Sequence, residues 1–329
     1  MRTLDLVIIG AGPTGMATAI EAQKHNLSYI MLDKGSLVNT IRYYPTNSTF
    51  FSTAELLELD GLPFPTTTPG KRPTRAEALE YYIAVARRYN LKVQPFTPVE
   101  NIKKTEEGFN VETSKGNYQS RYVVAATGYY DRPNYLNVPG EELPHVSHYY
   151  DEAFPYIGMD VAVVGGSNSA AENTLDLYQH GVNVKLIHHS EALKKSVKYW
   201  LKPNLENRIK EGSIPAYFHT EVQAIHQGKL DLVNSGNETF SVPADQVFLM
   251  TGYHPDAVFL QKLGVQIDED TLRPQYDADT LESNIPGLYL AGVVLAGYNT
   301  SEIFIENGRF HGEPIITDIL KKTRDKTLA

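Results

Sequence analysis

The sequence predicts an α/β fold built from two Rossmann-like, three-layer nucleotide-binding domains, the first of which is interrupted by the second. Two glycine-rich loops lead to this prediction, Gly10-Ala11-Gly12-Pro13-Thr14-Gly15 and Gly165-Gly166-Ser167-Asn168-Ser169-Ala170. Each loop follows an apolar, strand-like run and precedes a helix-like segment, as the βαβ unit of such domains requires. The loops begin at residues 10 and 165, a separation of 155 residues. This spacing indicates a duplicated unit rather than a short-period repeat.

The chain has 329 residues, which is enough for two domains. We place the first domain at residues 1–130 and 252–329 and the second at 131–251, with the Pro- and Gly-bearing stretch 132–141 as linker. The net charge of −9 argues against a nucleic-acid partner, because such proteins gather positive charge. The N-terminus lacks the pattern of a signal peptide, and no apolar run approaches the ~20 residues of a membrane span. We therefore expect a cytoplasmic protein with no membrane partner.

The first domain is expected to begin with a βαβ unit. Its elements are a strand at 5–9, a helix at 13–25 and a strand at 28–32. Residues 36–74 are rich in Tyr, Thr, Pro and Phe and predict loop with one short helix at 53–59. Thr74 and Glu77 then form a capping-box pattern ahead of a helix at 76–89.

Short strand patterns follow this helix and predict a small antiparallel sheet laid over the parallel one. They lie at 92–94, 99–104, 109–113 and 116–119. An apolar strand at 122–126 ends in Thr127-Gly128.

The second domain repeats the βαβ pattern. We predict its strand from 160, its helix at 170–180 and its next strand at 184–188. A strand at 247–250 ends in Thr251-Gly252-Tyr253, which echoes Thr127-Gly128-Tyr129. The chain then returns to the first domain with a strand at 287–291, Gly292, and a single helix from 303 onward.

The first loop has the residues that bind a dinucleotide. Gly10 makes the tight turn, Gly12 lets the backbone approach a pyrophosphate, and Gly15 lets the helix pack on the strand. Asp33 lies 18 residues beyond Gly15, close to the ~20 expected for the acid that holds the ribose. The alternative is an ordinary turn with a surface aspartate.

The second loop differs, since Ser167 replaces the middle glycine and Ala170 the last. The next predicted strand ends in His188-His189 rather than in an acid, and three lysines follow at 194, 195 and 198. An acid would repel the 2′-phosphate of NADP and cations attract it, so NADPH is favoured over NADH. The alternative is that these lysines form a solvated face. No histidine or carboxylate spacing suggests a metal site.

Two dinucleotide sites in one chain fit a flavoprotein, in which a flavin in the first site takes electrons from a nicotinamide in the second. Further stretches extend the pattern: Tyr44-Pro45 with Thr49-Phe50-Phe51-Ser52-Thr53, Ala125-Ala126-Thr127-Gly128-Tyr129, Lys198-Tyr199-Trp200 with Lys202-Pro203, Gly292-Val293, and the run from Ile303 to Gly312. With the two loops they resemble the bacillithiol disulfide reductase (YpdA-type) family, within the thioredoxin reductase-like flavoproteins. The resemblance covers nearly the whole chain.

The resemblance implies FAD in the first site, NADPH in the second, and a homo-oligomer, in the simplest case a homodimer. The residues implied around FAD are Gly10, Gly12, Pro13, Thr14, Gly15, Asp33, Lys34, Thr127, Gly128, Gly292 and Val293. Those implied at the NADPH pyrophosphate are Gly165, Gly166, Ser167, Asn168 and Ser169, with His189 and Lys195 near the 2′-phosphate. Glu306 and Asn307 lie in the family-like C-terminal run, and Tyr43, Tyr44 and His311 are candidate flavin neighbours or plain aromatic core.

One departure bears on the activity. The sequence holds no cysteine, so it has no disulfide, thiolate metal site or Cys-x-x-Cys pair. Family members typically carry a cysteine in the first loop where Thr14 stands here, and a threonine forms no mixed disulfide. Thr14 either donates a hydrogen bond to the cofactor or only fills the loop, and no general acid or base is identifiable from the sequence.

Three functions therefore stay open. The family resemblance implies an NADPH-dependent, FAD-containing reductase of a small disulfide. The missing cysteine raises a second possibility, an electron transferase between NADPH and a small carrier protein such as ferredoxin or flavodoxin. The third is a flavin-bound sensor without turnover.

Overall fold

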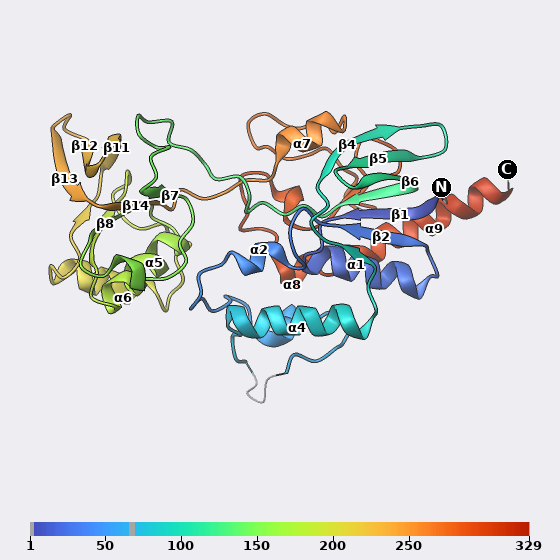
Figure 1. The fold of residues 1–329 in the computed structure, drawn as a ribbon, viewed down its shortest axis with the longest axis horizontal. Helices are drawn as coiled ribbons and strands as arrows, with labels where there is room; N and C mark the ends of the chain where they lie inside the picture. The colour runs from blue at the N-terminus through green and yellow to red at the C-terminus, as the bar shows by residue number, and fades with distance from the viewer. Residues whose placement is uncertain (1–2, 66–69, 329) are drawn as a thin grey trace. The chain divides into compact units, whose positions relative to one another are not determined.

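The computed structural model describes residues 3–65 and 70–328, and the chain forms two compact units (Figure 1). Unit 1 consists of Met1–Tyr43, Ser48–Arg132 and Tyr253–Ala329. Unit 2 consists of Pro133–Gly252 together with the short segment Tyr44–Asn47, which we had assigned to the first domain. The chain thus enters unit 2 from unit 1 and returns to it.

Unit 1 is built on a seven-stranded sheet. Its strand order is β3 (Val93–Gln94), β2 (Tyr29–Leu32), β1 (Leu4–Ile9), β6 (Gly116–Ala125), β5 (Phe109–Thr113) and β4 (Val99–Lys104), with β15 (Leu288–Leu290) also beside β6. β1, β2, β3, β6 and β15 run parallel to one another. β5 is antiparallel to both β6 and β4. Leu6, Val7 and Ile8 of β1 are fully buried, as expected for a central parallel strand covered on both faces.

The predicted separate antiparallel sheet is wrong. The two strands predicted at 116–119 and 122–126 are one strand, β6. Its first half pairs with β5 and its second half with β1, and Ser120 takes part in both pairings. The hairpin strands β4 and β5 therefore extend the parallel sheet instead of lying over it.

The helices of unit 1 include those predicted at 13–25, 53–59 and 76–89, and also two short helices that were not predicted, at 39–42 and 257–262. They are α1 (Pro13–Lys24), α2 (Asn39–Arg42), α3 (Ala54–Leu57), α4 (Arg75–Arg88), α7 (Ala257–Lys262), α8 (Ile305–Gly308) and α9 (Gly312–Leu328). The capping box of α4 is confirmed, because Thr74 Oγ1 accepts from Glu77 N–H and Glu77 Oε2 accepts from Thr74 N–H at 2.8 Å. The single helix predicted from 303 is wrong, since α8 and α9 are separated by residues 309–311.

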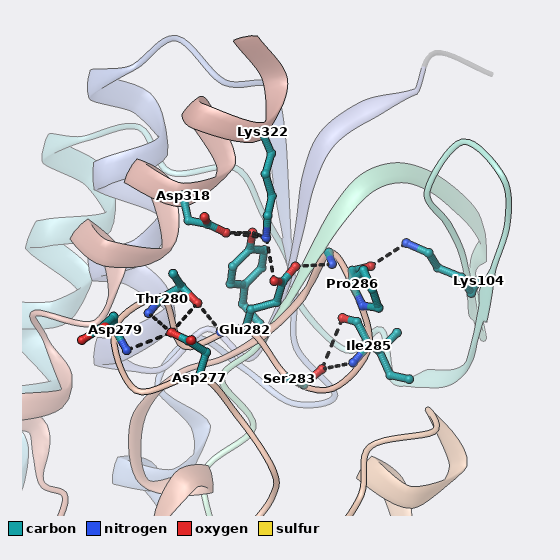
Figure 2. Close-up of polar contacts among 12 residues, drawn as sticks. Lys104, Asp277, Asp279, Thr280, Glu282, Ser283, Ile285, Pro286, Asp318 and Lys322 are labelled. Carbon is teal, nitrogen blue, oxygen red and sulfur yellow. Dashed lines mark hydrogen bonds and ion pairs between the residues drawn. The ribbon is translucent and has the colours of Figure 1, made fainter. Parts of the chain in front are cut away.

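A polar network fastens the C-terminal helix α9 to the central sheet (Figure 2). Lys322 Nζ lies 2.6 Å from Glu282 Oε2 and 2.6 Å from Asp318 Oδ2. The buried Tyr289 of β15 donates its hydroxyl to Asp318 Oδ2 at 2.6 Å. Because α9 also packs against α1, this network holds together the helix of the first glycine loop, α9 and the strand that leads to Gly292.

Unit 2 has three layers. Its parallel sheet has the order β10 (Ala216–Tyr217), β9 (Asn183–Ile187), β8 (Asp160–Val164), β14 (Gln246–Leu249) and β7 (Val146–Ser147), and the antiparallel sheet is β11 (Thr220–His226), β12 (Gly228–Asn234) and β13 (Thr239–Ala244). The helices are α5 (Asn168–Gln179) and α6 (Lys202–Lys210), and short 3₁₀ turns lie at Phe154–Tyr156 in unit 2 and Gly292–Ala296 in unit 1. Alternate residues of β8 face opposite layers: Val161 and Val163 pack with residues of α5 and α6, and Ala162 and Val164 with residues of β11, β12 and β13.

Candidate functional site

In unit 1 three parallel strands end at the same edge of the sheet. Ile9 of β1 and Leu290 of β15 both pair with Ala125 of β6. The segments that follow these strands are the glycine loop from Gly10, the turn Thr127–Gly128, and Gly292–Val293. The structure therefore brings the three predicted flavin-binding segments together at the carboxyl edge, where ligands of such sheets bind.

The first loop has the shape of a phosphate cradle. Gly10 has φ +107°, and a Cβ there would lie 2.3 Å from Ala126 O. A Cβ on Gly15 would lie 2.1 Å from Gly10 O. A Cβ on Gly12, in contrast, would have no atom of a described residue within 4 Å apart from its neighbours along the chain. Since α1 begins at Pro13 with no side-chain cap, its first N–H groups are free for an anion in the open space at Gly12, which fits the pyrophosphate of a dinucleotide.

Asp33 shapes this loop from the end of β2. Its Oδ2 accepts from Ala11 N–H at 2.7 Å and its Oδ1 from Gly35 N–H at 2.8 Å. Burial raises the pKa of the carboxyl, and these two backbone hydrogen bonds oppose the rise. The neighbouring Lys34 forms an ion pair with Asp131 at 2.8 Å. The acid thus supports the loop backbone, and its contact with a ribose stays a prediction.

Thr127 has a buried hydroxyl without a partner. Its Oγ1 is inaccessible to solvent and makes no hydrogen bond to any residue that the structure describes. A buried polar atom of this kind is rare in native proteins. Its backbone N lies 3.5 Å from the place of a Cβ on Gly10, so the hydroxyl stands beside the glycine loop. This orphaned atom fits a polar group of a bound cofactor.

Thr14 lies where the glycine loop meets the C-terminal segments. A Cβ on Gly292 would lie 2.9 Å from Thr14 Oγ1, and one on Gly308 would lie 3.1 Å from it. Gly292 N–H donates to His311 Nδ1 at 3.0 Å. Burial lowers the pKa of His311, which favours the neutral ring that this acceptor role requires. Gly308 is a neighbour that sequence reasoning missed.

The structure gives the surroundings of the other suggested flavin neighbours, whose contact with a flavin stays a prediction. Asn307 folds the start of α8, since its Oδ1 accepts from Phe304 N–H at 2.7 Å and its Nδ2 donates to Glu302 O at 2.9 Å. The side chain of Glu306 is half-buried. Tyr43 is exposed and lies under the Arg42 guanidinium, and Tyr44 belongs to unit 2.

The second glycine loop, in unit 2, repeats the design. Gly165 has φ +148°, and a Cβ there would lie 2.4 Å from Met250 O. A Cβ on Gly166 would lie 2.2 Å from His188 Nε2. Ser167 stands at the N-cap of α5 without a side-chain cap bond, and Ser169 is exposed. The first N–H groups of α5 are again free for phosphate.

His188 and His189 at the end of β9 face different surroundings. His189 is exposed, as is Lys195, so both are accessible to a 2′-phosphate. His188 is only 2% exposed, and burial, with His189 and Lys194 nearby, lowers its pKa to about 4 against the opposing effect of the Ala192 backbone. A neutral His188 supports the loop beneath Gly166. The glycine at 166 was the one sequence signal for this contact.

Asn168 does not point its side chain toward the loop. Its Nδ2 donates to Ser196 O at 3.3 Å and its Oδ1 accepts from Lys198 N–H at 2.9 Å. Within residues 3–65 and 70–328, no group of three or more His, Asp or Glu side chains has metal-site geometry. No helix in the same part of the chain is long and apolar enough to span a membrane.

Two glycine loops on parallel sheets, each followed by an uncapped helix, define a two-nucleotide flavoprotein oxidoreductase. The family model for pyridine nucleotide-disulphide oxidoreductases matches residues 7–292, and the chain belongs to this family. It is an FAD-dependent oxidoreductase that takes electrons from a pyridine nucleotide.

Three known proteins show how far the similarity extends. The chain is 42% identical over 317 residues to the bacilliredoxin reductase Bdr of Bacillus subtilis (strain 168), covering 96% of this chain and 97% of that protein. The bacillithiol disulfide reductase Bdr (YpdA) of Bacillus cereus has a similar structure, with a TM-score of 0.94, 44% identity and coverage of 98% and 100%. The bacillithiol disulfide reductase Bdr (YpdA) of Staphylococcus aureus has a TM-score of 0.94, 37% identity and coverage of 98% of this chain and 99% of that protein. The predicted family and fold class are confirmed.

Proposed function

We propose that this chain reduces a low-molecular-weight disulfide, with bacillithiol disulfide as substrate and NADPH as reductant. The observation that carries the proposal is the similarity over 98% of the chain to the bacillithiol disulfide reductase Bdr (YpdA) of Bacillus cereus, with both glycine loops intact. The balanced reaction is NADPH + H⁺ + RSSR → NADP⁺ + 2 RSH. When bound, FAD relays the electron pair between NADPH and the disulfide.

We assign the FAD site to the carboxyl edge of the unit 1 sheet. The residues proposed there are Gly10, Gly12, Pro13, Thr14, Gly15, Asp33, Lys34, Thr127, Gly128, Gly292 and Val293. The uncapped start of α1 binds the pyrophosphate, and the unpartnered Thr127 Oγ1 hydrogen-bonds a polar group of the cofactor. His311 Nδ1 accepts a hydrogen bond from the Gly292 N–H, so this turn is held in place for the flavin.

We assign the NADPH site to the carboxyl edge of the unit 2 sheet. The N–H groups that begin α5 bind the pyrophosphate beside Gly165, Gly166, Ser167, Asn168 and Ser169. The exposed His189 and Lys195 follow β9 and attract the 2′-phosphate. The same features fit NADH more weakly, because NADH offers no 2′-phosphate to these groups.

The disulfide step in this chain proceeds without a protein thiol. The sequence holds no cysteine, and Thr14 stands in the first loop at the junction with Gly292 and Gly308. With FAD bound, the substrate disulfide would therefore receive both electrons without a protein–substrate mixed disulfide, and two protons, one of them from solvent, would complete the two thiols as the S–S bond breaks. The role left to Thr14 is a hydrogen bond or a steric contact beside the flavin.

The test is NADPH oxidation by the purified FAD-loaded protein without oxygen. We expect turnover with bacillithiol disulfide and slower turnover with glutathione disulfide or cystine. No turnover above the rate without disulfide would overturn the proposal. NADH replaces NADPH in a parallel assay, which tests the nucleotide assignment separately.

The missing cysteine favours a second candidate, an electron transferase from NADPH to ferredoxin or flavodoxin. Such a transfer needs an exposed flavin edge but no thiol. Reduction of a carrier protein from the same cell, with no reduction of bacillithiol disulfide, would establish this candidate in place of the first.

We also propose that the enzyme works in the cytoplasm as a homodimer. The reducing thiol pool of that compartment is where NADPH-driven disulfide reduction operates. Fractionation of cells and light scattering of the purified protein test the two statements.

A further inference from the structure

A lysine-bearing turn lies against the second glycine loop. This turn, the lysine segment, comprises residues 194–198 of unit 2. Lys194 N–H donates to Gly166 O at 2.9 Å. The side chain of Asn168, the first residue of α5, donates to Ser196 O and accepts from Lys198 N–H. The segment is thus fastened both to the glycine loop and to the start of the helix.

The conformation of the lysine segment is defined by burial as well as by these bonds. Leu193 and Val197 are each 4% exposed and belong to the hydrophobic core of unit 2. Val197 N–H donates to Lys194 O at 3.1 Å, which closes the turn. Lys194 and Lys195 are exposed, and neither forms an ion pair with an acid in the part of the chain that the structure describes. Two ammonium groups are therefore held near the N-terminus of α5, where the nucleotide is proposed to bind.

Asn168 commits its side chain to this fastening. One amide N–H binds a backbone carbonyl 28 residues further along the chain, and the amide oxygen accepts from a backbone N–H 30 residues further along. The backbone N–H of Asn168, at the start of α5, stays available for a pyrophosphate. The side chain of the exposed Ser169, one residue on, has no bond to the lysine segment among the described contacts. The two neighbours thus have separable roles.

The charge of the segment distinguishes the two nicotinamide nucleotides. NADPH carries a 2′-phosphate that NADH lacks, and cations favour it. A turn that moves away from the glycine loop loses this attraction, while the pyrophosphate contacts common to both nucleotides stay.

We propose that Asn168 is a positioning residue that sets the preference for NADPH over NADH, because it holds the lysine segment against the nucleotide loop. This inference rests on the proposed NADPH site. It adds that the preference depends on a side chain that does not touch the 2′-phosphate.

The test compares kcat/KM for NADPH and for NADH, with ferricyanide as a general electron acceptor so that the natural disulfide plays no part. In N168A we expect the KM for NADPH to rise about tenfold, because the two hydrogen bonds that hold the lysine segment are lost. The KM for NADH and the kcat for both nucleotides should stay nearly unchanged. The matched control is S169A, in the same helical turn. We expect it to change the two KM values by the same factor.

Two further variants separate positioning from general damage. We expect K195A to lower the NADPH preference directly, because it removes a cation. In the double variant N168A/K195A the fold-decrease in NADPH preference should be smaller than the product of the fold-decreases in the two single variants, because both substitutions act through the lysine segment. N168D keeps the acceptor for Lys198 N–H and its charge suits a helix N-terminus, so it tests the proposal even if N168A fails to fold. We expect its NADPH preference to lie between those of the wild type and N168A.

The outcomes are distinguishable. A wild-type protein that prefers NADH overturns the proposed NADPH site. If the wild-type NADPH preference persists in N168A and N168D, the role of Asn168 is overturned while the NADPH site stands. The same holds if N168A and S169A reduce the preference equally.

Discussion

Protonation of His188 makes the stability of unit 2 depend on pH. The ring is 2% exposed and lies beneath Gly166, where a Cβ would approach Nε2 to 2.2 Å. Burial is the main cause that lowers its pKa from 6.5 to about 4. The folded protein therefore resists protonation of this ring, whereas the unfolded chain accepts the proton near pH 6.5.

The sign and size follow from this difference in pKa. Above pH 6.5 the ring is neutral in both states, and its full contribution to stability is present. As the pH falls from 6.5 toward 4 the unfolded state binds more protons, so stability is lost at about 1.4 kcal/mol per pH unit. The loss reaches about 2 kcal/mol at pH 5 and at most about 3 kcal/mol near pH 4.

The assay uses the single tryptophan of the chain, Trp200, which lies in unit 2. Urea unfolding followed by its fluorescence reports that unit at pH 7.5 and pH 5. We expect His188→Leu, which has no titratable group, to remove about 2 kcal/mol of the acid-induced loss. The matched control is Phe218→Leu, which removes a ring that contacts His188 and should lower stability equally at both pH values. An acid-induced loss in His188→Leu as large as in the wild type would refute the reasoning.

Three further predictions concern unit 1. Gly15→Ala places a Cβ 2.1 Å from Gly10 O, so the purified variant should contain little FAD. Gly12→Ala places its Cβ where no described residue beyond the chain neighbours lies within 4 Å, so this variant should remain folded and bind FAD more weakly. Equal FAD content in the two variants would contradict the loop geometry. Lys322→Met removes two ion pairs from a partly exposed side chain and should lower the free energy of unfolding by about 1 kcal/mol, measured by thermal melting of flavin fluorescence. Thr14→Cys should make disulfide reduction sensitive to iodoacetamide after treatment with NADPH, and no sensitivity would show that residue 14 lies away from the reacting disulfide.

Local features were predictable from the sequence. The βαβ order of each unit follows from glycine spacing and apolar runs, and Gly10 and Gly165 have the positive φ that this tight turn requires. The capping box of α4 is equally local, because Thr74 and Glu77 are three residues apart. Such signals depend on neighbours along the chain.

Features that depend on distant contacts were not predictable. Ser120 pairs with both β1 and β5, and this shared strand merges the predicted separate sheets. The last helix breaks at 309–311, where a Cβ on Gly308 would lie 3.1 Å from Thr14 Oγ1 and one on Gly312 would lie 2.8 Å from Thr18 Cα. The position of Asn168 in the glycine loop suggested a phosphate ligand. Its side chain instead binds a segment about 30 residues away, which local spacing does not reveal.

We propose that electrons pass from NADPH to a small disulfide without a protein thiol. The direct measurement is the number of bacillithiol molecules released per NADPH oxidised, without oxygen, by enzyme that has been reduced with NADPH and treated with iodoacetamide beforehand. We expect two thiols per NADPH at an undiminished rate, because the chain holds no cysteine to alkylate. NADPH oxidation without release of thiols would contradict it.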